Sequence, residues 1–335
     1  MINCNGMYIE INNYCNLNCI FCYNRSKKPK ENEYMSINTI NDIVEWAKLE
    51  KIKTIIISGG EPFLYPNFIE LLDIIKNNQE FNWHIATNGT IVEDSIINKI
   101  KDLNIIIHLS VHSHNILLDK KIRGVCLFNK TLEFMKKLKE SNVKFFFKTV
   151  INRINYDYIE DIYQFAIDNG GVPTFTYTNN DGSAIDNWNK LEITNKEKIL
   201  IFNKLKDLDK KNNINDSLTS CINDCPLLDI NKNIYIYINY LKEIYPCQLI
   251  SDKKYMIGEF NISSTTELIN NIKKINLILK QRLTIDYGCE NCFLKKDCMH
   301  GCCAKALLEN KDILSNDNNC DIRRQEIFKM IGIKL

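Results

Sequence analysis

The sequence predicts an α/β protein, with a partial (β/α)6 TIM-like barrel followed by a small cysteine-rich α+β domain. Six apolar, β-branched runs alternate with amphipathic helical stretches through the first two hundred residues. Cysteines then become frequent, and nine of the fourteen lie between residues 221 and 320. A chain of 335 residues is long enough for a barrel and a smaller domain. We expect a boundary near 215, giving domains 1–214 and 215–335.

The expected strands are near-continuous apolar runs, which are typical of a parallel sheet covered by helices. They are residues 7–12, 53–58, 83–87, 104–111, 143–151 and 172–178. The helices expected between them are residues 38–50, 66–78, 93–102, 129–141 and 156–169, and a lysine-rich helix follows at 195–213. Functional side chains in such a barrel belong at the carboxyl ends of the strands.

The first motif is a cysteine triplet, C-x3-C-x2-C, directly after the first strand. It consists of Cys15, Cys19 and Cys22. Cysteine thiolates are the usual ligands of iron-sulfur clusters. Three of them leave one iron of a four-iron cluster open, and an open position is typical of catalytic metal centres. A zinc knuckle or three core thiols is the alternative.

With Phe21 as the aromatic residue, the triplet resembles the C-x3-C-x-aromatic-C signature of the radical S-adenosylmethionine (SAM) enzymes. The resemblance implies a 4Fe-4S cluster held by Cys15, Cys19 and Cys22, whose open iron binds SAM, with Phe21 as a further cofactor-binding residue. It also implies that the reduced cluster cleaves SAM to methionine and a 5'-deoxyadenosyl radical, which takes a hydrogen atom from the substrate. The protein then binds, orients and shields the reactants.

A second motif follows the second strand, where Ser58-Gly59-Gly60-Glu61-Pro62 resembles the GGE motif of this family. Two glycines let the backbone approach a ligand and should leave amide and carbonyl groups free to bind it. By resemblance, Gly59, Gly60 and Glu61 contact the amino group of SAM. Taken alone, the same residues form an ordinary turn between a strand and a helix.

Further candidate SAM contacts lie after later strands. Thr87-Asn88-Gly89 is similar to the T-N-G of the family and makes Asn88 a candidate ribose contact. Ser110 ends the fourth strand and Arg123 is expected in a loop; by resemblance they contact the ribose and the carboxylate of SAM, which suits the two-pronged guanidinium. Asn152 is a further candidate near the ribose, and a turn-forming asparagine is the alternative.

Three histidines and two single cysteines carry weaker signals. His108, His112 and His114 lie around the fourth strand, where a polar lining of the SAM pocket explains them without a metal. Single cysteines are most often small core residues, and we expect this of Cys4 and Cys126.

The cysteine-rich end has a specific spacing, C-x2-C-x5-C-x3-C, followed by one more cysteine after a gap. It resembles the SPASM domain, an extension with auxiliary clusters on radical SAM enzymes that mature peptides and small proteins. Tyr245-Pro246-Cys247 is similar to its Y-P-C turn. The resemblance implies two auxiliary 4Fe-4S clusters, one on Cys221, Cys225, Cys247 and Cys302 and one on Cys289, Cys292, Cys298 and Cys320. Taken alone, these cysteines could also form a zinc site. Metal binding and folding should be linked in this part.

Three residues depart from the pattern or stand outside it. Lys242 replaces the glycine that precedes the Y-P-C turn, so this turn should differ. Gln248 stands where enzymes that oxidise a sulfatase residue to formylglycine tend to carry an aspartate base. Glutamine cannot take a proton, which disfavours this activity, although Asp252 could substitute. Cys303 is a surplus thiol, either packed beside a cluster or acting as a hydrogen-atom donor or transient substrate ligand.

Composition restricts the location and the partners. Formal charge is +2 with both signs interspersed, which predicts no nucleic-acid or membrane-surface binding. No signal segment or spanning apolar stretch is apparent, so we expect a cytoplasmic protein. Fourteen cysteines without an export signal favour metal ligation over disulfides. Oxygen-labile clusters would suggest an anaerobic cell.

The resemblance implies modification of a ribosomally made precursor peptide, by a thioether, carbon-carbon or carbon-oxygen crosslink. A flavodoxin or ferredoxin-type protein would supply electrons. Because the barrel starts near Met1, leader recognition would need a separate protein or another surface. The alternatives are oxidation of a protein such as a sulfatase, radical dehydrogenation of a small molecule, or a non-catalytic electron carrier with three clusters.

Overall fold

The computed structural model describes residues 4–25, 34–218, 225, 227, 234–260, 265–294, 298 and 300–330. Its strands are β1 (Cys4–Glu10), β2 (Thr54–Ser58), β3 (Asn82–Thr87), β4 (Ile105–Ser110), β5 (Lys144–Ile151), β6 (Val172–Tyr177), β7 (Ile234–Ile238), β8 (Glu243–Tyr245) and β9 (Gly258–Glu259). Its α-helices are α1 (Ile37–Leu49), α2 (Phe68–Asn77), α3 (Asp94–Ile100), α4 (Ile116–Arg123), α5 (Phe128–Glu140), α6 (Ile159–Asp168), α7 (Ser183–Leu191), α8 (Asn195–Asn212), α9 (Thr265–Lys280), α11 (Cys303–Asn310) and α12 (Cys320–Met330). The 3-10 turns are η1 (Pro62–Leu64), η2 (Tyr156–Tyr158), η4 (Lys253–Tyr255) and η5 (Gln281–Thr284).

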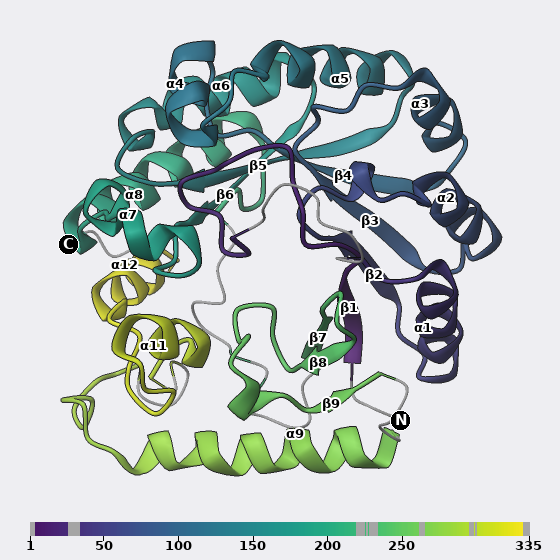
Figure 1. Ribbon diagram of the computed structural model, residues 1–335. Coiled ribbons are helices and arrows are strands. Elements are labelled where there is room, and N and C mark those ends of the chain that lie inside the picture. Colours follow the sequence, from purple (N-terminus) through teal and green to yellow (C-terminus); the bar gives the residue numbers. More distant parts are fainter. Residues whose placement is uncertain are drawn as a thin grey trace.

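One curved sheet organises these elements, in the order β6-β5-β4-β3-β2-β1-β7-β8-β9. Neighbours from β6 to β7 pair in parallel, and β8 and β9 join as antiparallel strands. Helices α1 to α6 cover the outer side of the curve (Figure 1). The α/β class with a repeated β-α pattern is therefore as predicted, and each of the six expected strands is present within three residues.

The two faces of the sheet differ in burial. Along β4, Ile105, Ile107 and Leu109 are buried and belong to the core shared with the helices. The alternate side chains Ile106, His108 and Ser110 are only partly buried. Successive strand residues point to opposite faces, so the apolar outer face anchors the helices and the inner face carries the polar groups.

Two helices of the barrel were not predicted, α4 and α7. The side chain of Asn115 accepts a hydrogen bond from the amide of Leu118 and caps α4, and Gly124 ends it with φ of 74°. Both residue types are common helix boundaries. The expectation that Arg123 lies in a loop is therefore wrong, because Arg123 is the last residue of α4.

The cysteine-rich part continues the sheet of the barrel, because β7 pairs with β1. A boundary near 215 stays a prediction. In the hairpin from β7 to β8, the turn residue Lys242 itself has φ of 69°, a left-handed conformation that glycine favours. Cys4 is buried as expected, whereas Cys126 is exposed, so its assignment to the core is wrong. In the part of the chain that is described, no helix is long and apolar enough to cross a membrane.

Candidate functional site

The loop with the first three cysteines, residues 11–25 (the cluster loop), crosses the inner side of the sheet beyond the carboxyl ends of the strands (Figure 1). It docks on the end of α4, where the amides of Asn18 and Ile20 donate to the carbonyl oxygens of Arg123 and Ile122 at 3.0 and 3.1 Å. Carbonyls at the end of a helix have no partner within it. The cluster loop satisfies two of them and is held in place by this contact.

The thiols of the cluster loop lie close enough to influence one another. Burial, with a smaller contribution from the charges of neighbouring cysteines, raises the pKa of Cys15 to about 11 and that of Cys19 to about 12. The Cys15 Sγ accepts from the amide of Leu17 at 3.4 Å and from the Asn88 side chain at 3.6 Å. Three converging thiols with donors to sulfur are a suitable ligand set for an iron-sulfur cluster.

The Gly59-Gly60-Glu61 turn is bonded to the start of the cluster loop. The Gly60 amide donates to the Asn12 carbonyl at 2.9 Å, and the Glu61 amide donates to the Tyr14 carbonyl at 2.8 Å. A Cβ at Gly60 would lie 2.0 Å from the Tyr14 oxygen, and one at Gly59 would lie 2.2 Å from Asn12 Oδ1. The expectation that this turn leaves its amides free is therefore wrong for Gly60 and Glu61. The glycines allow close approach of the cluster loop.

The carboxylate of Glu61 has three donors from the protein. Its Oε1 accepts from the Phe63 amide at 3.1 Å and from the Thr87 hydroxyl at 2.6 Å, and its Oε2 accepts from the Asn88 amide at 2.7 Å. Burial raises the pKa of Glu61 to about 7, against the effect of these hydrogen bonds. Glu61 therefore joins the ends of β2 and β3 beside Cys15. Its predicted contact with the amino group of SAM stays a prediction.

Arg123 forms a buried ion pair that sequence reasoning missed. Its Nε lies 3.2 Å from Oδ1 of Asp119, and both side chains are 1% exposed. The guanidinium also donates to the carbonyl oxygens of Asn88 and Ser110. Asp119 stands four residues before Arg123, the spacing of facing helical residues, so a helix prediction here would have suggested the pair. Arg123 links α4 to the ends of β3 and β4.

The other predicted SAM contacts occupy different settings. Asn88 Nδ2 also donates to Asn16 Oδ1 at 2.9 Å, which places it against the cluster loop. Asn152 is fully buried, and its Oδ1 accepts from the amide of Ile154 at 2.9 Å, a contact typical of a turn-forming asparagine. The ring of Phe21 lies edge-on to His112, with centroids 4.7 Å apart. Their contacts with SAM stay predictions.

The three histidines around the fourth strand, His108, His112 and His114, have different neighbours. His108 lies 2.8 Å from His84 between ring nitrogens, and sequence reasoning missed His84. His112 is buried and accepts from the amide of Val150 at 3.1 Å; burial and then the charge of Arg123 lower its pKa. Within the described ranges, no three His, Cys, Asp or Glu side chains are grouped so as to hold a single metal ion.

A buried carboxylate at the end of β1 was also missed. Glu10 accepts hydrogen bonds from the side chains of Asn24 and Tyr237. Burial raises its pKa. Since Asn24 belongs to the cluster loop and Tyr237 to β7, Glu10 joins the predicted catalytic loop to the cysteine-rich part.

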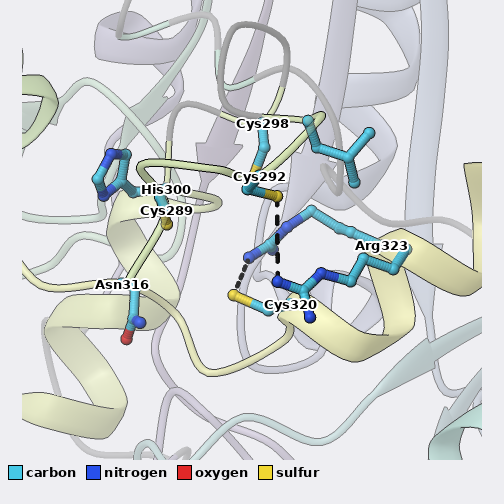
Figure 2. A pocket seen from close by; sticks show the side chains of 9 residues that line it. Cys289, Cys292, Cys298, His300, Asn316, Cys320 and Arg323 are labelled. Atoms are coloured by element: carbon cyan, nitrogen blue, oxygen red, sulfur yellow. Dashed lines mark hydrogen bonds between the residues drawn. The ribbon is translucent and has the colours of Figure 1, made fainter. Parts of the chain in front are cut away.

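A second group of thiols surrounds a cavity near the C-terminus. Cys289, Cys292, Cys298 and Cys320 line it together with Arg323 and Arg324. Arg323 lies near Cys320 (Figure 2), and its Nη2 is 3.7 Å from the Cys320 Sγ. The Nη2 of Arg324 is 4.0 Å from the Cys292 Sγ. Four thiols around a cavity with cationic donors fit a cluster with thiolate ligands.

Asp317 connects this cavity to a third group of thiols. Its carboxylate pairs with Arg323 at 2.7 Å and accepts from the Cys302 amide at 2.9 Å. Burial opposes ionisation of Asp317, but the hydrogen bonds and charge of Arg323 outweigh it and keep the pKa below its usual value. The pair is buried, with exposures of 1% and 2%. Asp317 was not predicted from the sequence.

The third group contains Cys225, Cys247, Cys302 and Cys303. The Sγ atoms of Cys225 and Cys303 are 3.6 Å apart, and the charges of Cys225, Cys247 and Cys302 act on Cys303. Cys221, the remaining predicted ligand, lies outside the described residues. Gln248 is partly buried, and Asp252, the substitute base considered above, is exposed and caps η4.

Comparison with known proteins gives a family match. The model of the radical SAM superfamily matches residues 9–166. An uncharacterised protein of Methanocaldococcus jannaschii is 31% identical over 168 residues, 48% of this chain and 58% of that protein. The chain thus spans little more than half of this relative. A cysteine-type anaerobic sulfatase-maturating enzyme of Clostridium novyi is 25% identical over 86% of this chain and 84% of its own length.

A peptide-maturing relative and a solved structure extend the comparison. The sporulation killing factor maturation protein of Bacillus subtilis is 26% identical over 58% of this chain and 47% of its own length. The structure of SuiB from Streptococcus suis bound to S-adenosylmethionine has a TM-score of 0.75 at 18% identity, covering 95% of this chain and 77% of SuiB. At this identity the likeness concerns the fold, and it supports the predicted partial barrel with a cysteine-rich extension.

Proposed function

We propose that this chain, whose residues 9–166 match the model of the radical SAM superfamily, modifies a ribosomally made precursor peptide by hydrogen-atom abstraction, forming a thioether or other crosslink. The observation that carries the proposal is the presence of three separate thiol groups in one fold. One lies in the cluster loop, one lines the cavity of Figure 2, and one surrounds Cys225. An enzyme that only cleaves SAM needs the first group alone.

The proposed cofactors are SAM and three 4Fe-4S clusters. The residues fit: the cluster loop offers three thiols and leaves one iron open, and the cavity of Figure 2 is lined by four thiols. The third cluster would use Cys225, Cys247 and Cys302, with Cys221 as the predicted fourth ligand. When bound, the first cluster and SAM supply hydrogen-atom abstraction, and the auxiliary clusters supply a place for the electron left over when a crosslink forms.

Residues of the chain position the proposed catalytic cluster. The Gly59-Gly60-Glu61 turn and the end of α4 hold the cluster loop on two sides. Asn88 donates to the sulfur of Cys15 and lies in the Thr87-Asn88-Gly89 segment that Glu61 anchors. Arg123 provides a positive charge beside Cys19, which stabilises its thiolate. Together these contacts prepare a rigid site before the reactants bind.

A peptide substrate is supported by the relatives. The Bacillus subtilis relative is named for maturation of the sporulation killing factor, and SuiB has also been solved with its precursor peptide SuiA, at a TM-score of 0.73 and 18% identity. As partners we propose a precursor peptide, a flavodoxin or ferredoxin-type reductant, and a separate leader-recognition protein. We propose a cytoplasmic location in an anaerobic cell.

The first test is the content of iron, sulfide and zinc after anaerobic reconstitution. We expect roughly twelve irons per chain, four for each cluster. Cys15→Ala should lose about four of them and all 5'-deoxyadenosine production, whereas Cys289→Ala should lose about four and keep SAM cleavage. About four irons with zinc would make the cysteine-rich part a structural zinc site. Clusters without any SAM cleavage would favour the electron carrier.

The second test addresses the substrate. Candidate precursor peptides encoded beside this gene should lose the mass of two hydrogen atoms on incubation with the enzyme, SAM and a reductant. One hydrogen leaves to form 5'-deoxyadenosine, and the other leaves as a proton while its electron goes to an auxiliary cluster. If the enzyme cleaves SAM rapidly but the peptide stays unmodified, the peptide is excluded as the substrate, and the proposed radical chemistry still stands.

Sulfatase maturation is the second candidate, because the Clostridium novyi relative matches 86% of this chain. A cysteine-containing sulfatase peptide would then be converted to formylglycine. Gln248 cannot act as the base that this oxidation needs. If the precursor peptide is the substrate, as proposed, the wild-type enzyme should be inactive on the sulfatase peptide, and Gln248→Asp should gain activity on it. Formylglycine formation by the wild type would favour this candidate over the precursor peptide.

A further inference from the structure

Cys303 belongs to neither predicted ligand set, yet its side chain is fully buried within the third group of thiols. It is the first residue of α11, directly after the predicted ligand Cys302, which occupies the N-cap. Its Sγ lies 3.6 Å from the Sγ of Cys225, a residue 78 positions earlier in the chain. This distance is within the range of a hydrogen bond between sulfur atoms.

The chemistry of the pair determines which sulfur donates. A cysteine that ligates a cluster is a thiolate and carries no proton. Cys225 as a ligand can therefore only accept, and Cys303 must supply the hydrogen. The 3.6 Å between the two sulfur atoms is the separation of a hydrogen-bonded pair, which suits one ligand and one donor.

We propose that the thiol of Cys303 donates a hydrogen bond to the thiolate of Cys225 and thereby raises the reduction potential of the auxiliary cluster that Cys225 holds. The proposal rests on the proposed cofactor set. Hydrogen bonds to ligand sulfurs and limited exposure to solvent are known controls of cluster potential. The donor withdraws negative charge from the ligand sulfur. The reduced cluster is the more negative form, so this hydrogen bond stabilises it more than it stabilises the oxidised form.

This role concerns the electron left over in crosslink formation. A higher potential makes the auxiliary cluster a better acceptor for that electron, and a buried donor holds its effect without competition from water. Cys303 is thus a positioning and tuning residue, and it touches neither SAM nor substrate. No covalent change of Cys303 is required in the proposed role.

The test compares wild type with Cys303→Ala, Cys303→Ser and Cys126→Ala after anaerobic reconstitution. Cys126 is the matched control, because it is a free cysteine on the surface. Iron and sulfide per chain are measured first, followed by a redox titration read by electron paramagnetic resonance. Cys303→Ala should keep all iron, and one cluster should lose about tenfold in its equilibrium constant for accepting an electron, about 59 mV for one electron. Cys303→Ser should fall between it and wild type, and Cys126→Ala should be unchanged.

Every other outcome overturns the proposal in an identifiable way. Loss of about four irons from Cys303→Ala would make Cys303 a ligand. Full iron with unchanged potentials would make it a packed thiol. A wild type that binds no cluster at Cys225 would remove the acceptor, and its iron count would show that the cofactor proposal had failed as well. Lower SAM cleavage without a change in potential would indicate a structural defect.

Discussion

The contact between the Gly60 turn and the cluster loop makes Gly60→Ala a sharp test of how the site is held. A Cβ at this position would lie 2.0, 2.3 and 2.7 Å from the backbone O, C and N of Tyr14, whereas ordinary van der Waals contact begins at 3.4 Å. The backbone of Tyr14 cannot rotate away as a flexible side chain could. The substitution must therefore push the cluster loop off the turn, one residue before Cys15.

The cost follows from the bonds that join the two segments. The separation would break the hydrogen bonds from Gly60 N to Asn12 O, from Glu61 N to Tyr14 O and from Asn12 Nδ2 to Glu61 O, at 2.9, 2.8 and 2.9 Å. Each contributes about 1 kcal/mol. The loss of three hydrogen bonds, together with residual overpacking of about 1–3 kcal/mol, gives a free-energy cost of roughly 4–6 kcal/mol for the substitution. This is more than enough to displace Cys15 from its place beside Asn88.

The assay is iron content together with SAM cleavage after anaerobic reconstitution. Gly60→Ala should lose about four irons per chain and all 5'-deoxyadenosine production, and it should keep the auxiliary clusters. Gly170→Ala is the control, because a Cβ added there would come no closer than 3.6 Å to any atom beyond its chain neighbours, while its φ of 78° strains the alanine backbone locally. A Gly60→Ala protein with full iron and normal SAM cleavage would refute the reasoning.

Three further predictions concern stability. Lys242→Gly should stabilise the protein by about 1 kcal/mol, because glycine adopts the φ of 69° without steric cost; a thermal midpoint no higher than that of Lys242→Ala would contradict this. Burial raises the pKa of Glu61 from 4.5 to about 7, so the protonated form is favoured in the folded state. The free energy of unfolding should therefore fall by about 3 kcal/mol as the pH rises from 4.5 to 7. Urea unfolding at a series of pH values should show this decline for the wild type and not for Glu61→Gln. The same pH dependence in both proteins would contradict the prediction. Asp119→Ala should cost about 3–5 kcal/mol because it leaves Arg123 buried and unpaired. Glu140→Ala, which removes an exposed pair, should cost under about 1 kcal/mol, and equal urea midpoints for the two variants would argue against a buried pair.

Much of the fold could be predicted because its signals are local. The strand 144–151 was expected at 143–151 and the helix 128–140 at 129–141, since an apolar strand run and a 3.6-residue period appear in any short window. Helix α4 has only eight residues, too few for a clear period, although Asn115 and Gly124 mark its ends. The caps were the available signal, and missing them put Arg123 in a loop.

The spacing of cysteines and glycines could likewise be read without a structure. The triplet Cys15, Cys19 and Cys22 and the group from Cys289 to Cys320 are close in sequence, so their spacing limits how they can meet a metal. The close approach permitted by Gly59 and Gly60 was also expected. The partner in this close approach was not the expected ligand. The turn packs against the cluster loop, and two amides of the turn donate hydrogen bonds to that loop.

By itself, the sequence determined the α/β class, the cysteine triplet of the cluster loop, the cysteine run that begins at Cys289 and the strand ends that carry the polar residues, because each depends on residues near one another in the chain. Tertiary structure alone decided which distant groups share a site. Glu10 meets Tyr237 across 227 residues, and Cys225 meets Cys303 across 78. Such contacts depend on the pairing of β1 with β7 and on the packing of α11, and no local pattern of residues encodes those distances.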